Sequence, residues 1–582
     1  MTETIIGIDL GTTNSEVAVV QNGRVKVIDA SPDKKILPSF VGLADDGAIL
    51  VGEPAKNQYG LYPERTIKSI KRQMGSEEKV MLGIHAYSPQ EISAIILRRL
   101  KDIAEADLGI PLRKAVITVP AYFSDAQRQA TREAGEIAGL EVVRMINEPT
   151  AAALSYEAGR QEHKRVLVYD LGGGTFDVSV VSIEDDVVEV LASHGNNHLG
   201  GDDFDAKIVA HLVEHLKRQG VDVTASRQAM ARLNRAAEAA KIALSDRPYV
   251  RIEEEYLLER QGTPVNLSLE LERHDYEAMI APYIDETLEA VHIALKGAGL
   301  TVADLDEILL VGGATRTPLV TSRLEEDLGL TVRAEVDPEL CVATGAAIQG
   351  AMIAGESVAA VLVDITPYTF GTSCLGELNG DLYPFFYVPV IHKNTPIPVT
   401  KSEAFYTIHD NQTTVEVSIY QGEDPDALNN IKIGEFTVEN LSRVPAGNPI
   451  ILQLALDLDG ILQVSAREKN TGLEKSIRID NAISRFREGE LEAARERVEA
   501  LFSQQEPRAV ETGAGGTSRQ LKVQAEALVE KAERMLDEAA PDDREDIIGL
   551  IETIRDALRT EAVDALPKAM DELADILFYL ES

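Results

Sequence analysis

The chain has 582 residues, 44% of them hydrophobic, so it is long enough for several domains with apolar cores. Its formal net charge of −39 at pH 7 opposes binding to nucleic acid and to anionic membrane surfaces. We therefore expect no nucleic acid and no membrane among its partners. A solubilising acidic surface is the ordinary explanation of such a charge.

The two cysteines, Cys341 and Cys374, have no further cysteine or histidine at metal-ligand spacing. This argues against a zinc site and favours two small buried residues of a reducing compartment. No basic run precedes the first motif in MTETIIGIDLG, so we expect no secretory signal. The apolar stretch 341–355 is too short to span a bilayer. Together these features predict a soluble, cytoplasmic protein.

Two stretches of the chain are similar to each other. DLGTTNSEVAVV begins at Asp9 and DLGGGTFDVSVV begins at Asp170, and they are identical at six of twelve positions. Each follows an apolar run predicted as a strand (5–8 and 166–169) and leads into valines predicted as the returning strand. Glycine-rich turns present backbone N–H groups to anions. Two facing copies therefore predict a clamp on a polyphosphate, with both aspartates placed to hold its divalent cation.

The pattern along the chain predicts a domain sequence. Strands alternate with helices from residue 4 to about 355, as in an α/β domain. Alternating apolar residues then predict strands, with Val415, Val417 and Ile419 on one face and a hairpin turn at Asp459-Gly460. From about 485 the pattern is helical, with a break at 512–518 and boundaries at Pro541 and Pro567. The expected helices of the first part are 89–106, 125–138, 226–245 and 275–298, and the predicted domains are 1–355, an apolar linker 356–364, an all-β domain 365–484 and a helical tail 485–582.

A third glycine-rich element, VGGATRTP at 311–318, follows a predicted strand at 307–310. Gly312 and Gly313 would let the backbone lie flat beside a nucleoside, and Arg316 can stack on a purine. After two DLG turns, this element indicates a nucleotide site.

These motifs together resemble the seventy-kilodalton heat-shock chaperones, the DnaK-type family, in a shortened, divergent, bacterial-like form. The resemblance implies a multidomain fold, with an actin-like α/β ATPase domain, an all-β peptide-binding sandwich and an α-helical lid. It fades after about Ser484. The matching segments are GIDLGTTNS, VPAYFSDAQRQATREAGEIAGLEVVRMINEPTAAALSY, YDLGGGTFDVSVV, VGGATRTP, DITPYTFG, KNTPIP, DNQTTVEVSIYQGE and DLDGILQVSAREKNTG.

The resemblance implies ATP or ADP with Mg²⁺ as cofactors, and it allows K⁺ as a further ion. Asp9 and Asp170 would serve the Mg²⁺ site through coordinated water. Lys71, in TIKSIKR, would orient the attacking water and stabilise charge on the γ-phosphate, as phosphoryl transfer requires. The further catalytic residues implied are Glu148, Thr175 and Asp177. The implied nucleotide contacts are Gly11, Thr12, Thr13, Gly172, Gly173, Gly174, Thr175, Gly200, Gly201, Glu238, Lys241, Ser245, Gly312, Gly313, Arg316 and Asp337.

Ordinary interpretations stay open for some of these residues. Lys71 could be a surface lysine of a basic segment, and Asp177 could cap a turn. Glu238, Lys241 and Ser245 follow the i, i+3, i+7 spacing that any amphipathic helix offers to solvent.

The resemblance also implies a cleft for extended peptides, in which Leu375 and Ile408 form an arch and Val415 fills the central pocket. Backbone hydrogen bonds and alternate side-chain pockets would select short apolar segments. For Phe405, Val417 and Ile461, a place in the sandwich core is the alternative. The implied cleft residues are Phe370, Thr372, Cys374, Leu375, Phe405, Tyr406, Ile408, Val415, Val417 and Ile461.

A further set of residues matches family positions that relay nucleotide state between the domains. For the first three, a helix-flanking proline and two exposed arginines are the ordinary interpretation. An exposed apolar triplet in the linker has few uses other than docking. The implied coupling residues are Pro120, Arg128, Arg144, Val361, Leu362, Val363 and Asp364.

The sequence departs from the family pattern at several places. The segment between Lys71 and Pro89 is shorter than usual, so we expect a trimmed peripheral subdomain. After Leu375 an aromatic-rich stretch, GELNGDLYPFFYVPVIHKN, either reshapes the cleft, adds a client contact or packs on itself as a longer hairpin. Thr372 and Cys374 leave the peptide preference open, and the short tail leaves lid closure open. The aromatic residues concerned are Tyr383, Phe385, Phe386 and Tyr387.

The predicted function is an ATP-dependent chaperone that binds and releases extended hydrophobic segments of unfolded proteins, with ATP hydrolysis controlling peptide affinity. The family implies a J-domain co-chaperone and a nucleotide exchange factor as partners. A chaperone dedicated to one client system, such as cofactor assembly, and an ATP-binding holdase without efficient cycling are the alternatives. A metabolic kinase would share the clamp, but it gives no reason for the apolar linker or the β domain.

Overall fold

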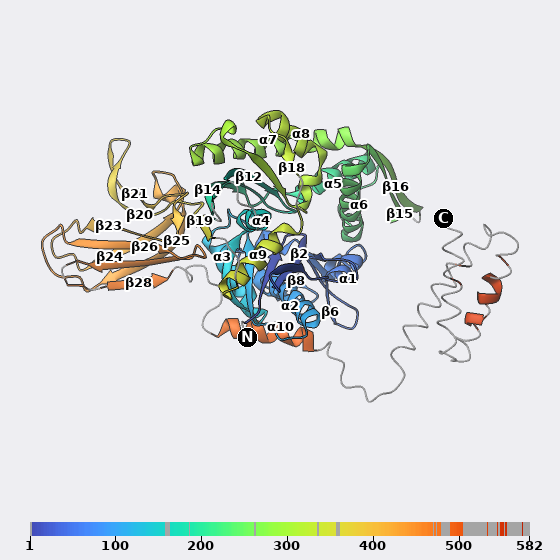
Figure 1. Ribbon diagram of the computed structural model, residues 1–582, viewed down its shortest axis with the longest axis horizontal. Helices are drawn as coiled ribbons and strands as arrows, with labels where there is room; N and C mark the ends of the chain where they lie inside the picture. Colours follow the sequence, from blue (N-terminus) through green and yellow to red (C-terminus); the bar gives the residue numbers. More distant parts are fainter. Residues whose placement is uncertain are drawn as a thin grey trace. The chain divides into compact units, whose positions relative to one another are not determined.

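The computed structural model describes residues 3–157, 163–184, 187–260, 263–333, 337–356, 361–469, 471–472, 474–478 and 489–503, with further positions between 532 and 573 (Figure 1). The chain divides into two compact units, 1–505 and 506–582. The four-part division expected from the sequence stays a prediction. The predicted break at 512–518 and the boundaries at Pro541 and Pro567 lie outside the described residues.

The first sheet contains the first glycine turn. Its strands lie in the order β11-β10-β1-β2-β3, with β4 paired to β2. β1 and β2 form an antiparallel hairpin, whereas β10 and β11 continue the sheet in parallel. The bounds are β1 (Ile5–Leu10), β2 (Asn14–Gln21), β3 (Arg24–Val27), β4 (Leu37–Pro38), β10 (Lys114–Val119) and β11 (Glu141–Asn147).

The second sheet repeats this arrangement around the second glycine turn. Its order is β18-β17-β12-β13-β14, again with an antiparallel hairpin followed by parallel strands, and β19 and β22 extend it. The duplication expected from the two DLG stretches is therefore confirmed in the strand order. The bounds are β12 (Lys164–Leu171), β13 (Phe176–Glu184), β14 (Val187–Asn196), β17 (Glu307–Val311), β18 (Val332–Arg333), β19 (Val361–Ile365) and β22 (Pro396–Ile397).

Helix α9 (Cys341–Ile353) packs on the first sheet and on α4 (Glu148–Glu157). At Gly7, on β1, an added Cβ would lie 2.1 Å from the backbone nitrogen of Ala347, so a side chain there would push the helix off the sheet. The apolar stretch noted in the sequence is thus a buried helix. In the part of the chain that the structure describes, no helix has the length and apolar character needed to cross a membrane.

The four helices predicted for the first part are confirmed, with ends that differ by a few residues. They are α2 (Pro89–Leu108), α3 (Asp125–Ile137), α6 (Arg227–Asp246) and α7 (Arg273–Ala298). Ser88 and Ser124 begin α2 and α3 with complete capping boxes. The remaining elements of this part are β5 (Phe40–Leu43), β6 (Ile49–Val51), α1 (Glu53–Gln58), β7 (Thr66–Lys68), β8 (Val80–Leu82), β9 (His85–Tyr87), α5 (Gly201–Arg218), β15 (Tyr249–Arg260), β16 (Thr263–Glu272) and α8 (Pro318–Leu328).

The all-β part consists of two sheets, with orders β21-β20-β24-β25 and β23-β26-β27-β28. Val417 and Ile419 are buried in the core of this part, and Val415 packs against it, as the alternation predicts. The hairpin expected at Asp459-Gly460 joins β26 and β27. The bounds are β20 (Phe370–Leu378), β21 (Asp381–Ile391), β23 (Val399–Tyr406), β24 (Thr414–Gln421), β25 (Ile431–Glu439), β26 (Pro449–Leu456), β27 (Leu462–Glu468) and β28 (Glu474–Arg478).

The aromatic-rich stretch after Leu375 forms the long β20–β21 hairpin. Tyr387 is buried with Tyr420, and the hydroxyl of Tyr383 donates to the Asp426 carboxylate, at 3.0 Å. These contacts favour the self-packing interpretation. Phe385 keeps 40% of its surface exposed, so it is available to other contacts. Cys374 in the same hairpin is half-buried, whereas Cys341 is buried, so the burial predicted for both cysteines is wrong for Cys374.

We call the part built around the first sheet the first lobe and the part built around the second sheet the second lobe. Helix α10 (Glu490–Ser503) packs on the first lobe through Ala494 and Val498, which are buried in the same apolar cluster as residues of α2 and α3. Arg497 also donates to Glu91, at 2.8 Å. In the second unit, residues 547–551 and 553–555 are helical, and Ile547, Ile551 and Ile554 are buried at helical spacing.

We expect Ser124→Ala to lower the free energy of unfolding of the lobe that contains α3 by about 1 kcal/mol, because the first turn loses its cap. Denaturant titration followed by amide exchange in α3 measures this change. Ser322→Ala, which removes an exposed hydroxyl inside α8, is the control and should leave stability within about 0.5 kcal/mol. Equal stabilities of the two variants would show that the capping box does not stabilise α3.

Candidate functional site

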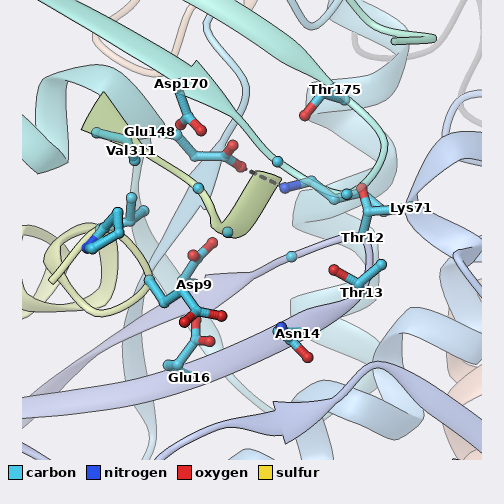
Figure 2. A pocket seen from close by; sticks show the side chains of 18 residues that line it. Asp9, Thr12, Thr13, Asn14, Glu16, Lys71, Glu148, Asp170, Thr175 and Val311 are labelled. Atoms are coloured by element: carbon cyan, nitrogen blue, oxygen red, sulfur yellow. Dashed lines mark hydrogen bonds and ion pairs between the residues drawn. The ribbon is translucent and has the colours of Figure 1, made fainter. Parts of the chain in front are cut away.

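A pocket with about 510 Å³ of empty space lies where the turns of the two duplicated hairpins meet (Figure 2). The residues predicted from the sequence that line it are Asp9, Gly11, Thr12, Thr13, Lys71, Glu148, Asp170, Gly172, Gly173, Thr175, Gly312 and Gly313. The lining residues that sequence analysis missed are Asn14, Glu16, Val311, Pro338, Glu339 and Val342.

The strand ends place an acidic pair on each side of the pocket region. Asp9 lies opposite Glu16 across the β1–β2 hairpin, and Asp170 lies opposite Asp177 across the β12–β13 hairpin. Directly opposed residues of an antiparallel pair point to the same face of the sheet. The duplication therefore brings four carboxyl groups toward the region between the two lobes.

Lys71 is 4% exposed and forms an ion pair with Glu148 inside the pocket (Figure 2). This burial rules out the surface-lysine interpretation. Burial lowers the pKa of Lys71, but the charges of Glu148 and Asp9 outweigh it, so the pKa lies above its ordinary value. The ammonium group therefore stays charged at neutral pH.

The carboxyl groups of the pocket are strongly perturbed. Burial raises the pKa of Asp9, of Glu16 and of Asp170, and it raises the pKa of Glu148 to about 7. The Thr118 hydroxyl donates to Asp9, at 2.7 Å, and partly offsets this effect. Among the described residues that line the pocket, Lys71 is the one cation. The site thus has more acidic than basic groups, and burial favours the neutral form of the acids until a cation is present.

This donor set fits a hard cation that arrives with a polyphosphate. Mg²⁺ is bound through one or two carboxylates together with substrate phosphates rather than by an all-protein cage. Asp9 and Asp170 supply such carboxylates on opposite sides of the pocket. Within the described residues, no group of three or more histidine, cysteine or acidic side chains could hold a metal by itself. The chemistry of the pocket therefore agrees with Mg²⁺ shared between protein and phosphates.

The loops around the pocket contact each other closely. An added Cβ at Gly174 would lie 2.6 Å from a methyl carbon of Thr12, so the two phosphate turns touch. The N–H of Gly201, at the start of α5, donates to the carbonyl of Gly172, at 2.9 Å. Gly174, Gly200 and Gly201 thus support the second turn without lining the pocket.

Asp177 does not line the pocket either. Its carboxylate accepts hydrogen bonds from the backbone N–H groups of Ala121 and Tyr122, both at 3.1 Å. Asp177 therefore caps the turn at residues 121–122, and its implied catalytic role stays a prediction. These bonds tie the second glycine hairpin to the loop that follows Pro120.

Five further residues implied as nucleotide contacts do not line the pocket, namely Glu238, Lys241, Ser245, Arg316 and Asp337. Glu238 on α6 pairs with Lys56 on α1, at 2.9 Å, which bonds the two lobes to each other. Lys241 donates to the carbonyl of Gly201, at 3.1 Å, and pairs with Asp205. The other members of the set bond locally, Ser245 to the Lys241 carbonyl and Arg316 to Asp337 and Glu339.

The predicted cleft residues fall into groups. Leu375, Tyr406 and Ile408 are exposed, whereas Cys374 is half-buried. The buried Thr372 hydroxyl donates to the carbonyl of Ser418, at 2.7 Å. The residues that belong to the sandwich core or pack against it are Phe370, Phe405, Val415 and Val417.

The assignment of Ile461 to the cleft does not hold in this structure. Its side chain is fully buried in the apolar cluster of the first lobe, with residues of α2 and α3, and not in the sandwich core. The reason is the position of Ile461 just after the β26–β27 turn, where the hairpin tip contacts the first lobe. Asp459 in that turn forms an ion pair with Arg132 and accepts from the N–H of Met145, at 2.8 Å. Sequence analysis missed this contact, although an acidic turn residue was visible.

Several of the predicted coupling residues meet at the linker, but Pro120 and Arg144 are not shown to contact it. Arg128 is buried and donates to the side-chain oxygen of Asn147, at 2.7 Å, while the Asn147 amide donates to Asp364, at 2.8 Å. Val361 and Val363 pair in parallel with β14, so the linker strand extends the second sheet. Pro120 is buried, against the ordinary expectation of a helix-flanking surface residue, and Arg144 is half-buried on β11.

Comparisons with known proteins agree with this geometry. The family model described as Hsp70 protein matches residues 5–83 and 76–580. The chaperone protein DnaK of Thermotoga petrophila is 43% identical over 586 residues, covering 98% of this chain and 95% of that protein. DnaK of Thermotoga neapolitana is 44% identical and DnaK of Thermosipho africanus 43% identical, at the same coverage. The matched motifs, the duplicated fold and the pocket agree, and the chain belongs to the Hsp70 family of ATP-dependent chaperones.

Proposed function

We propose that this chaperone hydrolyses ATP in the pocket between the two glycine hairpins and uses the linker to control a peptide cleft in the β-sandwich. The main observation in support is that both glycine turns, Asp9, Asp170 and the buried Lys71–Glu148 pair all line one pocket. Membership of the family supports the activity.

In this proposal, the backbone N–H groups of the two turns bind the phosphates, as glycine-rich anion sites do. Lys71 stabilises the charge that develops on the transferred phosphoryl group, and Glu148 holds the lysine in place. Asp9 and Asp170 would hold Mg²⁺, which neutralises phosphate charge when bound. Thr175 lines the pocket and can donate its hydroxyl to a phosphate or to water. A site for K⁺ stays a prediction.

The nucleoside would lie toward Gly312, Gly313 and Arg316, because the two glycines line the pocket at the end of β17, beside the second hairpin, and Arg316 follows them. Arg316 presents a half-exposed guanidinium that can stack on a purine. Glu238, Lys241 and Ser245 line the neighbouring face of α6. The Lys56–Glu238 ion pair would then hold the lobes together over bound nucleotide.

We expect Lys71→Ala to reduce ATP hydrolysis by at least about a hundredfold while ADP binding changes by less than about tenfold, because the lysine acts on developing charge. Single-turnover hydrolysis and calorimetric ADP titration measure the two effects. Lys68→Ala, in the same segment but outside the pocket lining, is the control and should hydrolyse normally. Wild-type turnover in Lys71→Ala would refute the assignment.

We propose that client segments bind beside the exposed Leu375, Tyr406 and Ile408 on the sandwich. These side chains leave apolar surface accessible next to strand edges, as extended-peptide recognition requires. Phe370, Phe405, Val415 and Val417 would act as the floor, because they already pack in or against the core. Phe385 in the long hairpin adds a further exposed aromatic side chain.

Bonds between the pocket and the sandwich support coupling between the two sites. Asp177 bonds the loop at Ala121 and Tyr122, and the hydroxyl of Tyr368 donates to the carbonyl of Tyr122, at 2.5 Å. The linker strand and Asp364 form a second connection through Asn147. A change in the second glycine hairpin can thus reach the sandwich by two routes.

We expect Val361→Asp combined with Leu362→Asp to abolish stimulation of ATP hydrolysis by an extended apolar peptide. The charges oppose packing of β19 against β14 and the apolar cluster around Leu362. Basal hydrolysis is compared with and without peptide. Val361→Ile with Leu362→Val keeps an apolar strand and should keep the stimulation; undiminished stimulation in the double aspartate variant would remove the linker from the mechanism.

A J-domain co-chaperone and a nucleotide exchange factor are proposed as partners, on the strength of the family alone. The alternatives of a dedicated client system and of a slow-cycling holdase are separated by the same peptide-stimulation measurement. Stimulation by unrelated apolar peptides supports a general chaperone, whereas stimulation by one client alone supports a dedicated one. A cytoplasmic location stays a prediction.

A further inference from the structure

Two acidic side chains of the pocket, Glu16 and Glu339, have no role in the assignments above, and Glu339 is paired with Arg316. Glu16 lies on β2 directly opposite Asp9 on β1, and both carboxylates line the pocket side by side (Figure 2). Glu16 is 2% exposed, and among the described residues its hydrogen-bond partner is the Asp9 carboxyl group. A buried carboxyl group that faces another carboxylate either holds a proton or has a cation close to it.

The duplication shows that this position can serve a different purpose. Asp177 occupies the corresponding place in the second hairpin, where two backbone N–H groups satisfy its carboxylate outside the pocket lining. Glu16 has one more methylene group than Asp177, and its carboxylate reaches the pocket. In the first hairpin this carboxyl group therefore faces the pocket, whereas in the second hairpin it accepts hydrogen bonds from a loop.

The charges in the pocket do not balance without a cation. The acidic residues that line it are Asp9, Glu16, Glu148, Asp170 and Glu339, and Lys71 is already paired with Glu148. A nucleotide would add several phosphate charges to this surplus. Because water screens buried charges poorly, burial favours the neutral form of these acids until a cation enters with the phosphates.

We propose that Glu16 is a positioning carboxylate for the cation that accompanies the nucleotide. With Asp9 it forms an acidic pair that faces this cation and makes nucleotide binding by this chain strongly dependent on divalent metal. The inference rests on the proposed function, since it assumes a nucleotide in this pocket. Carboxylate oxygens are the ligands that Mg²⁺ and Mn²⁺ prefer.

Glu16→Gln keeps the shape of the side chain and removes its charge. Without divalent cation, the variant should bind ADP about as tightly as wild type, because the buried Glu16 carboxyl group then shares a proton with Asp9 and adds little negative charge. With saturating Mg²⁺, it should bind ADP more weakly, because the cation loses an attractive partner. The ratio of the ADP Kd without Mg²⁺ to the Kd with Mg²⁺ should fall by about tenfold or more, as for one close, partly screened charge pair.

Calorimetric titration of the full-length chain with ADP, in EDTA and in Mg²⁺, gives this ratio independently of hydrolysis. Electron paramagnetic resonance of Mn²⁺ added with ADP gives cation affinity directly, and we expect weaker Mn²⁺ binding in the variant. Glu133→Gln is the matched control, because Glu133 is 3% exposed, lies outside the pocket lining and bonds the amide of Gln90. Its ratio should equal that of wild type.

An unchanged ratio in Glu16→Gln would overturn the proposal and leave Glu16 as a neutral hydrogen-bond donor to Asp9. A wild-type chain whose ADP affinity does not respond to Mg²⁺ would instead refute the proposed cation site, and with it this part of the proposed function. Should the Gln variant fail to fold, Glu16→Asp serves as the test. It retracts the carboxylate by one methylene group, so its ratio should fall, and a wild-type ratio there would equally overturn the proposal.

Discussion

The structure depends on the burial of charge between two copies of one hairpin. Asp9, Asp170 and Glu148 lie in the pocket with Lys71 as their cation, and the lysine is paired with Glu148. Removing one partner of such a buried pair costs about 3–5 kcal/mol, since the other charge stays uncompensated. The surrounding elements must therefore hold both lobes close together. The contact between Gly7 on β1 and Ala347 on α9 shows how tightly a helix packs on the first lobe.

The same charged region is bonded to the rest of the first unit. Asp177 of the second glycine hairpin accepts a hydrogen bond from the loop after Pro120. The hydroxyl of Tyr368, in the sandwich, donates to the carbonyl of Tyr122 in that loop. The Asp459 carboxylate accepts a hydrogen bond from the N–H of Met145 on β11, the edge strand of the first sheet. Coupling between distant sites requires elements that both sites can bias. The bonds of Asp177 and Tyr368 together connect the second glycine hairpin, through the loop at Tyr122, with the sandwich.

Local patterns predicted the framework well, because the features concerned are set by neighbouring residues. The two hairpins, the four helices and the turn at Asp459-Gly460 follow from alternation, capping and glycine chemistry. Contacts between distant segments were not predictable in this way. The burial of Ile461 in the first lobe depends on where the hairpin tip docks, which periodicity does not encode. The bonds of Arg128 to Asn147 likewise require the tertiary structure, and an isolated arginine gives no sign of burial.

For Glu16 the sequence did contain a signal, but matching the two stretches by identical residues did not reveal it. Matching the two DLG stretches by identical residues passes over the Glu16 and Asp177 pair, which differ by one methylene group and share the acidic function. In the fold, one carboxyl group lines the pocket and the other caps a loop. Duplication preserved the position of the acidic group, whereas its neighbours differ between the two copies. The two halves of the clamp are therefore alike in backbone and unlike in chemistry: one directs its second carboxyl group into the pocket, and the other bonds it to the loop that contacts Tyr368.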